Sequence, residues 1–169
     1  MTRRHAIGTI FLGGAAFSLL PACNFEELPT FQHFEVERTA FERLEVLSRL
    51  ALPINDLPLE TPEPTVNYIL TVVDQSYKPE DRTRFVEGMT AYPEFMKANS
   101  DRRFKKWTAE DVLAHLELME SLPAEEPIGY FYQTTKGLSK QHFTTSPYYM
   151  RDYLDYQFIP GGYEGCVPV

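Results

Sequence analysis

The residues that could do chemistry are few in this chain, and their spacing argues against an active site. A catalytic or metal site brings several reactive side chains together. Beyond residue 5, no two histidines lie three or four positions apart, and no cysteine stands near one at zinc-site spacing. We therefore predict no metal site. We also expect His115 to lie on the polar face or at the boundary of its helix. The four histidines are His5, His33, His115 and His142.

The remaining reactive groups favour structural roles. Glu125 and Glu126 are adjacent carboxylates at a helix entry, where acidic side chains interact favourably with the helix dipole. Cys166 has no histidine or cation nearby that would activate its thiol. Motifs for dinucleotides, nucleotide phosphates, c-type haem and a serine nucleophile are absent from the sequence. We therefore predict no catalytic residue and no bound cofactor in this chain.

Composition and charge indicate an acidic globular protein. The chain has 169 residues, 43% of them hydrophobic, and a formal net charge of −8. This length suffices for one domain with a substantial core. An acidic surface repels a phosphate backbone, so we expect no nucleic-acid partner.

The first 22 residues are typical of an export signal. Arg3 and Arg4 precede an uncharged stretch over residues 6–20, and small residues follow before Cys23. Fifteen residues are too short to span a bilayer comfortably as a permanent helix. The Arg3-Arg4 start resembles the twin-arginine export signal, with a plain secretory signal as the alternative. Either route predicts a periplasmic location.

Cys23 admits three interpretations, and the sequence leaves them open. The stretch Leu20-Pro21-Ala22-Cys23 resembles the site at which lipoprotein signals are cut, and lipidation would anchor the mature chain at the membrane. A disulfide with Cys166 is permitted outside the cytoplasm. An ordinary cleavage site requires neither modification.

Hydrophobic spacing predicts an all-α fold. We expect a signal segment at residues 1–22, a tether at 23–32 and a single helical domain of five to six helices at 33–169. Proline-rich loops separate the helices, and no Asn-Gly or Asp-Gly hairpin signal supports a β fold. The expected helical segments are 33–52, 65–77, 78–100, 107–120, 127–143 and 147–156.

Local signals predict where several helices begin or break. Thr108 and Asp111 form a variant of the capping box. Pro79 stands at a first-turn position, which suits proline because it lacks an N–H group. Pro93 is expected to kink or divide its segment.

The C-terminal 22 residues are rich in tyrosine. Tyr149, Tyr153 and Tyr156 recur at i, i+4 and i+7 and would share one helical face, with Tyr148 offset. One face could pack on the domain while the other aromatics bind a partner. The alternative is that every ring seals the domain's own core. The predicted partner surface comprises Tyr148, Tyr149, Tyr153, Tyr156, Phe158, Pro160 and Tyr163.

Four segments resemble, in order, the gluconate 2-dehydrogenase subunit 3 family. They are residues 41–58, 65–89, 104–120 and 130–165, of which the last is the most specific. The resemblance implies a small helical subunit of a membrane-associated flavin dehydrogenase, with no catalytic residue of its own. It also implies a large FAD-containing partner of the glucose-methanol-choline type, which oxidises sugars, sugar acids or polyols. In such complexes a cytochrome c is a further partner that passes electrons to the respiratory chain.

These observations lead to a hypothesis of an accessory subunit that exports and stabilises a flavoprotein. Flavin is loaded in the cytoplasm, so the large subunit must fold before export, and the twin-arginine route carries folded proteins. A large subunit without a signal could then leave the cell bound to this chain. The alternative is a free-standing periplasmic lipoprotein that binds a ligand or scaffolds the envelope.

Overall fold

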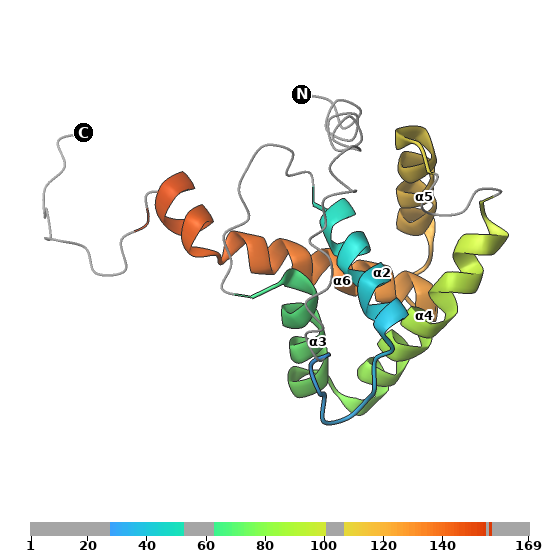
Figure 1. Cartoon of the computed structure of the whole chain (residues 1–169), viewed down its shortest axis with the longest axis horizontal. Helices are drawn as coiled ribbons and strands as arrows, with labels where there is room; N and C mark the ends of the chain where they lie inside the picture. Colours follow the sequence, from blue (N-terminus) through green and yellow to red (C-terminus); the bar gives the residue numbers. More distant parts are fainter. Residues whose placement is uncertain (1–27, 53–62, 101–106, 155, 157–169) are drawn as a thin grey trace, which may run out of the picture.

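The computed structural model describes residues 28–52, 63–100, 107–154 and 156 (Figure 1). Within these ranges there are six helices and no β-strand, which confirms the predicted all-α domain of five to six helices. The elements are α2 Arg38–Leu50, α3 Thr65–Ser76, α4 Pro79–Ala98, α5 Ala109–Ser121, α6 Pro127–Thr144 and the short π-helix η3 Tyr148–Tyr153.

Helix α6 is the central element, because it contacts each of the other five helices. Figure 1 shows it running across the molecule, with α2 crossing it, α3 and α4 diverging from it, and α5 beside its beginning. Its buried face supplies Phe131, Tyr132 and Leu138 to the core. Burial of large apolar side chains is the dominant favourable contribution to folding, so these side chains help to hold the surrounding helices on α6.

A glycine allows α4 and α6 to cross closely. A methyl group added at Gly88 would lie 2.1 Å from the carbonyl oxygen of Pro127 and 2.6 Å from Cβ of Phe131. Contacts that short essentially never occur, so the backbones could not keep this separation with any larger residue. Next to the crossing, the rings of Phe85 and Phe131 pack with centroids 5.2 Å apart.

Three predicted helix beginnings are confirmed. Thr108 caps α5: its side chain accepts the backbone N–H of Asp111, and the Asp111 carboxylate accepts the N–H of Thr108 at 2.8 Å. Pro79 and Pro127 occupy the first turns of α4 and α6, where a missing N–H costs little.

Two sequence-based expectations about helix limits are wrong: that Pro93 divides its segment, and that a helix begins at residue 33. α4 continues through Pro93 as one helix of 20 residues, because Tyr92 and Met96 on either side are buried in the core and hold the segment helical. α2 begins at Arg38, not at residue 33. The residues before it pair with α3 through the carboxylate of Asp74, so they remain outside the helix.

No helix among the described residues combines the length and the hydrophobicity needed to cross a bilayer.

Candidate functional site

The most accessible apolar surface lies on residues 148–156, which we call the aromatic arm. The arm follows α6 and projects away from the other helices (Figure 1). Its backbone is held by local turn bonds: Leu154 N–H donates to Tyr149 C=O at 3.0 Å, and Tyr156 N–H to Met150 C=O at 2.8 Å. These bonds give the arm a defined conformation. π-Helical turns of this kind occur frequently at functional sites.

The tyrosines of the arm form a series from the domain outward. Tyr149 packs against Phe143 of α6, with ring centroids 5.2 Å apart. Tyr153 stacks on Tyr149, also at 5.2 Å and with the planes 21° apart. Tyr148 and Tyr149 are half-buried. The inner rings therefore attach the arm to the domain and the outer ring remains accessible.

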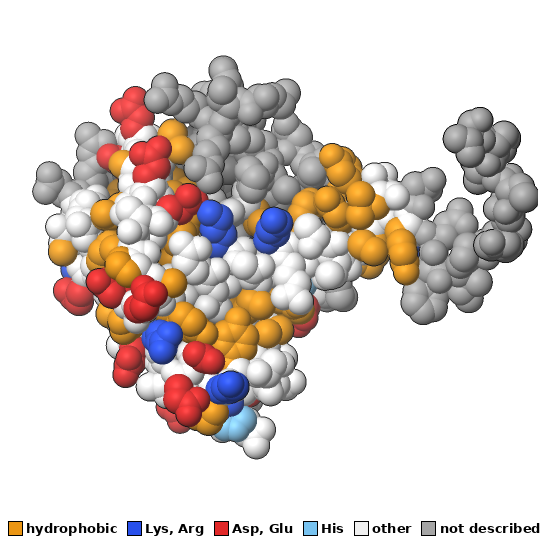
Figure 2. All heavy atoms as spheres, turned by 180° about the vertical axis from the view of Figure 1, so that it is seen from behind, with side chains coloured by type: hydrophobic (Ala, Val, Ile, Leu, Met, Phe, Trp, Pro, Cys, Tyr) orange, Lys and Arg blue, Asp and Glu red, His pale blue; other side chains and the backbone are white. Residues whose placement is uncertain are grey.

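Three neighbouring side chains make up the exposed apolar surface of the arm. Tyr153 is 62% exposed, Leu154 52% and Tyr156 48%. Within the described part of the chain, no other large hydrophobic side chain is exposed. Figure 2 shows apolar side chains gathered on the arm, whereas charged side chains are spread over the body of the domain. An apolar cluster of this kind marks an interaction site more often than single scattered residues do.

The predicted three-tyrosine helical face is wrong at its outer end. η3 ends at Tyr153 and is a π-helix, so Tyr156 lies beyond the helix and does not continue an α-helical i, i+4, i+7 series. Sequence reasoning also missed Leu154, whose exposure follows from its position at the C-cap of η3. The apolar character of residues 153–156 was the available signal.

Several predicted site residues lie outside the described ranges. They are Arg3, Arg4, Cys23, Phe158, Pro160, Tyr163 and Cys166.

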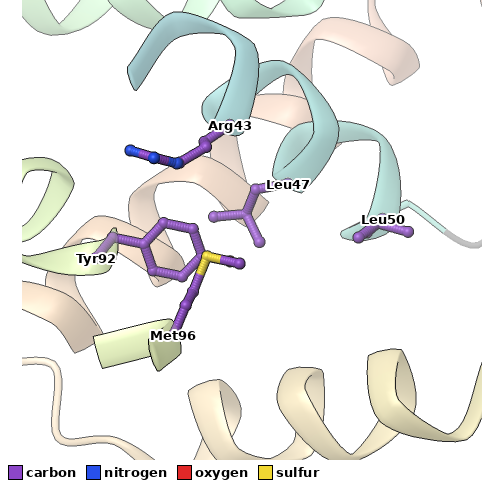
Figure 3. Close-up of a pocket in the computed structure, with 5 residues that line it drawn as sticks. All are labelled: Arg43, Leu47, Leu50, Tyr92 and Met96. Carbon is purple, nitrogen blue, oxygen red and sulfur yellow. The ribbon is translucent and has the colours of Figure 1, made fainter. Parts of the chain in front are cut away.

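A small hollow between α2 and α4 offers no room for a cofactor. Leu47, Tyr92 and Met96 converge on it, with Arg43 and Leu50 at its edges (Figure 3). Its enclosed volume is only about 10 Å³. Ligand pockets enclose roughly 300–1,000 Å³, so a flavin or a sugar would not fit here. The part of the chain that is described also holds no group of three histidine, cysteine or acidic side chains that could bind a metal ion.

His115 does not lie on the polar face of α5, and that expectation is wrong. It is 6% exposed, and its Nε2 shares a hydrogen bond of 2.9 Å with the hydroxyl of Tyr92. The ring of Trp107 packs at 4.8 Å. Burial lowers the pKa of His115 to about 4, so the imidazole is neutral near pH 7. Because Tyr92 comes from α4, the sequence of α5 alone does not reveal this contact.

We expect the stability of the domain to fall as the pH is lowered from about 6.5 towards about 4. Over this range His115 binds a proton in the unfolded chain but stays neutral in the folded chain, so acid favours unfolding. Urea midpoints at a series of pH values would measure the slope. His115→Gln should reduce this slope. The slope that remains would come from His142, because burial also lowers the pKa of His142, although Glu63 opposes this effect. An unchanged slope in this variant would assign the effect to another group.

His142 is likewise a buried structural residue. Its Nδ1 lies 3.1 Å from the hydroxyl of Thr65, and its ring stacks on Tyr68 at 4.5 Å. These contacts join the end of α6 to the beginning of α3, just before the arm.

Asp74 is a buried carboxylate that sequence reasoning did not single out. It is 3% exposed, and its oxygens accept the backbone N–H groups of Gln32 at 3.0 Å and His33 at 2.9 Å. The imidazole Nδ1 of His33 lies 3.1 Å from the same carboxylate. Burial alone would raise the pKa of Asp74, but these hydrogen bonds outweigh it and lower the pKa, so the group is ionised. The available signal was its position four residues after the buried Leu70.

Comparison with known proteins identifies one related family. The family model described as gluconate 2-dehydrogenase subunit 3 matches residues 39–161. This range includes α2 to α6 almost completely and the whole aromatic arm. No curated protein and no solved structure matches the chain.

Proposed function

We propose that this chain binds, stabilises and exports the flavin-containing large subunit of a periplasmic dehydrogenase. The premise is that the chain belongs to the gluconate 2-dehydrogenase subunit 3 family. As a member of this family the chain is a small subunit of a dehydrogenase complex. The FAD would be held by the large subunit, of the glucose-methanol-choline type, acting on sugars, sugar acids or polyols. A cytochrome c would be a further partner for electron transfer.

The aromatic arm is the observation that carries this proposal. A subunit of a complex needs a surface for its partner, and the cores of such surfaces are rich in tyrosine and poor in charge. Tyr153, Leu154 and Tyr156 provide an apolar surface of this type. The arm also lies within the range matched by the family model. We therefore assign the large subunit as the occupant of this surface.

The role in export rests on the N-terminal sequence. Arg3 and Arg4 precede a mildly hydrophobic stretch, as in signals for the transport of folded proteins. The assembled pair would leave the cytoplasm with its flavin already bound. Cleavage before Cys23 and lipidation there would then hold the complex at the membrane.

Purification from the periplasm tests the partner. A tagged chain is expected to co-purify with a larger yellow protein that carries FAD. A colourless monomer would instead favour a free-standing lipoprotein. Intact mass spectrometry of the same sample would show whether Cys23 carries acyl chains, forms a disulfide with Cys166 or is the residue after an ordinary cut.

A double substitution tests the export role. Arg3→Lys and Arg4→Lys together keep the charge, and they are expected to retain both subunits in the cytoplasm because the twin-arginine signal requires arginine. Cell fractionation with an assay for FAD-bearing large subunit in each fraction would measure this. Normal periplasmic levels of the large subunit in the variant would contradict the role as export escort.

A further inference from the structure

The segment before α2 is bound to the domain along its length, and we call residues 31–37 the strap. The rings of Phe31 and Phe34 stack on each other with centroids 5.3 Å apart, and both pack against the core. Val36 packs against the core as well. Between the two rings, Gln32 and His33 present their N–H groups to Asp74.

A single charged side chain, that of Asp74, binds the backbone of the strap. Two consecutive amides donate to the two oxygens of Asp74, and the His33 imidazole adds a third interaction. In the described part of the chain, no lysine or arginine pairs with Asp74, and the imidazole of His33 is the basic group beside it, at 3.1 Å. Hydrogen bonds to an ionised acceptor are stronger than those to a neutral one.

Release of the strap would remove these three contacts from the ionised Asp74 carboxylate, and water would have to replace them. The strap is therefore expected to favour the bound state, in which the hydrogen bonds to the ionised carboxylate and the packing of both rings are kept. The stacked phenylalanines and the carboxylate act together, since either contact positions the other.

We propose that Asp74 is a latch that fixes where the N-terminal segment leaves the domain and so limits the distance between that domain and the processed N-terminus. This inference rests on the proposed cleavage before Cys23. With the strap bound, seven residues, 24–30, separate Cys23 from the first docked ring, and they can span at most about 25 Å. With the strap released, residues 24–37 intervene and the limit rises to about 50 Å.

The consequence is a shorter reach at the N-terminal end. A chain anchored at Cys23 would hold α3 close to the membrane surface. A loose strap would double that distance and allow the domain to turn freely. The latch would therefore restrict which faces of an attached dehydrogenase point towards its membrane partners.

Amide hydrogen exchange on the purified full-length chain tests the latch directly. We expect slow exchange at Gln32 and His33. Asp74→Asn keeps the shape and removes the charge, and it should raise exchange at both amides about tenfold or more, since ionised acceptors hold hydrogen bonds more strongly. Gln32→Pro removes one donor without touching α3 and should raise exchange at His33. Gln75→Ala, an exposed neighbour of Asp74 on the same helix, should change nothing.

A second measurement guards against a variant that simply unfolds. Chymotrypsin cleaves after phenylalanine, so release of the strap should expose Phe31 and Phe34 to rapid cutting while amides of α4 and α6 stay protected. Rapid exchange at Gln32 and His33 in the unmodified chain would overturn the latch, as would unchanged exchange in both variants. These experiments need no partner and no membrane. A well-docked strap in a chain that brings down no flavoprotein would refute the proposed function and leave the latch standing.

Discussion

Tyr153→Ala combined with Tyr156→Ala is expected to weaken binding of the large subunit by about a hundredfold or more. A single interface residue of the dominant type contributes about 2 kcal/mol or more, which corresponds to roughly a thirtyfold change in Kd. Tyrosine is among the residues most often found in this role. The two side chains are also the outermost rings of the arm, where a partner would bury them first.

The same double variant should leave the domain folded. Tyr153 and Tyr156 are 62% and 48% exposed, and substitutions at such positions usually change stability by less than about 0.5 kcal/mol. Titration of the purified large subunit against each variant, followed by calorimetry or a fluorescence change, would give the Kd. Thermal unfolding of the same samples would give the stability.

Asp152→Ala is the matched control for this experiment. Asp152 is an exposed polar residue of the same arm, so its removal shortens a neighbouring side chain without changing the apolar surface. We expect an affinity close to that of the unmodified chain. An unchanged Kd in the double tyrosine variant would remove the arm from the interface and return the aromatic tail to a role within its own domain.

Gly88→Ala is expected to destabilise the domain strongly for so small a change. The added methyl group would lie 2.1 Å from the carbonyl oxygen of Pro127, so α4 and α6 must move apart along their shared core. Overpacking of a well-packed interior costs about 1–3 kcal/mol and occasionally more. For a domain of this size each kcal/mol lowers the melting temperature by about 2–4 °C.

Gly137→Ala is the same chemical change, and it is expected to raise the stability of the domain. A methyl group at this exposed position of α6 would meet no atom within 4 Å. Alanine favours the helical state over glycine by up to about 1 kcal/mol. Urea denaturation of both variants should therefore show one curve shifted to lower and one to higher denaturant. A rise in stability for Gly88→Ala would mean that the two helices do not cross at this residue.

Features set by neighbours in sequence could be predicted, because their physical causes are local. Pro79, Pro127 and the Thr108–Asp111 pair act within one turn of their own helix, and they mark its beginning as expected. The long apolar periodicities gave the all-α fold for the same reason. Pro93 shows the limit of such reasoning, since contacts of the flanking side chains with the core overrule its local preference.

Features that depend on residues far apart in sequence could not be predicted from one chain. His115 is buried because Tyr92 and Trp107 meet it, and the partner of Asp74 lies about 40 residues away in the strap. Gly88 matters because the first turn of α6 lies against it. At the candidate site, the sequence indicated tyrosines at the C-terminal end. The π-helical backbone decides which rings face outward, and the hydrophobic periodicity of the sequence did not predict a π-helix.

The position of α6 has a mechanical consequence. The aromatic arm follows α6, which contacts each of the other helices in the described part of the chain. A load applied to the arm, such as the drag of a bound protein during passage through a narrow channel, would be transmitted along α6 to the whole core. The load would not peel away one peripheral helix at a time. The domain should therefore resist extraction from its C-terminal side as a single cooperative unit, and yield abruptly once α6 moves.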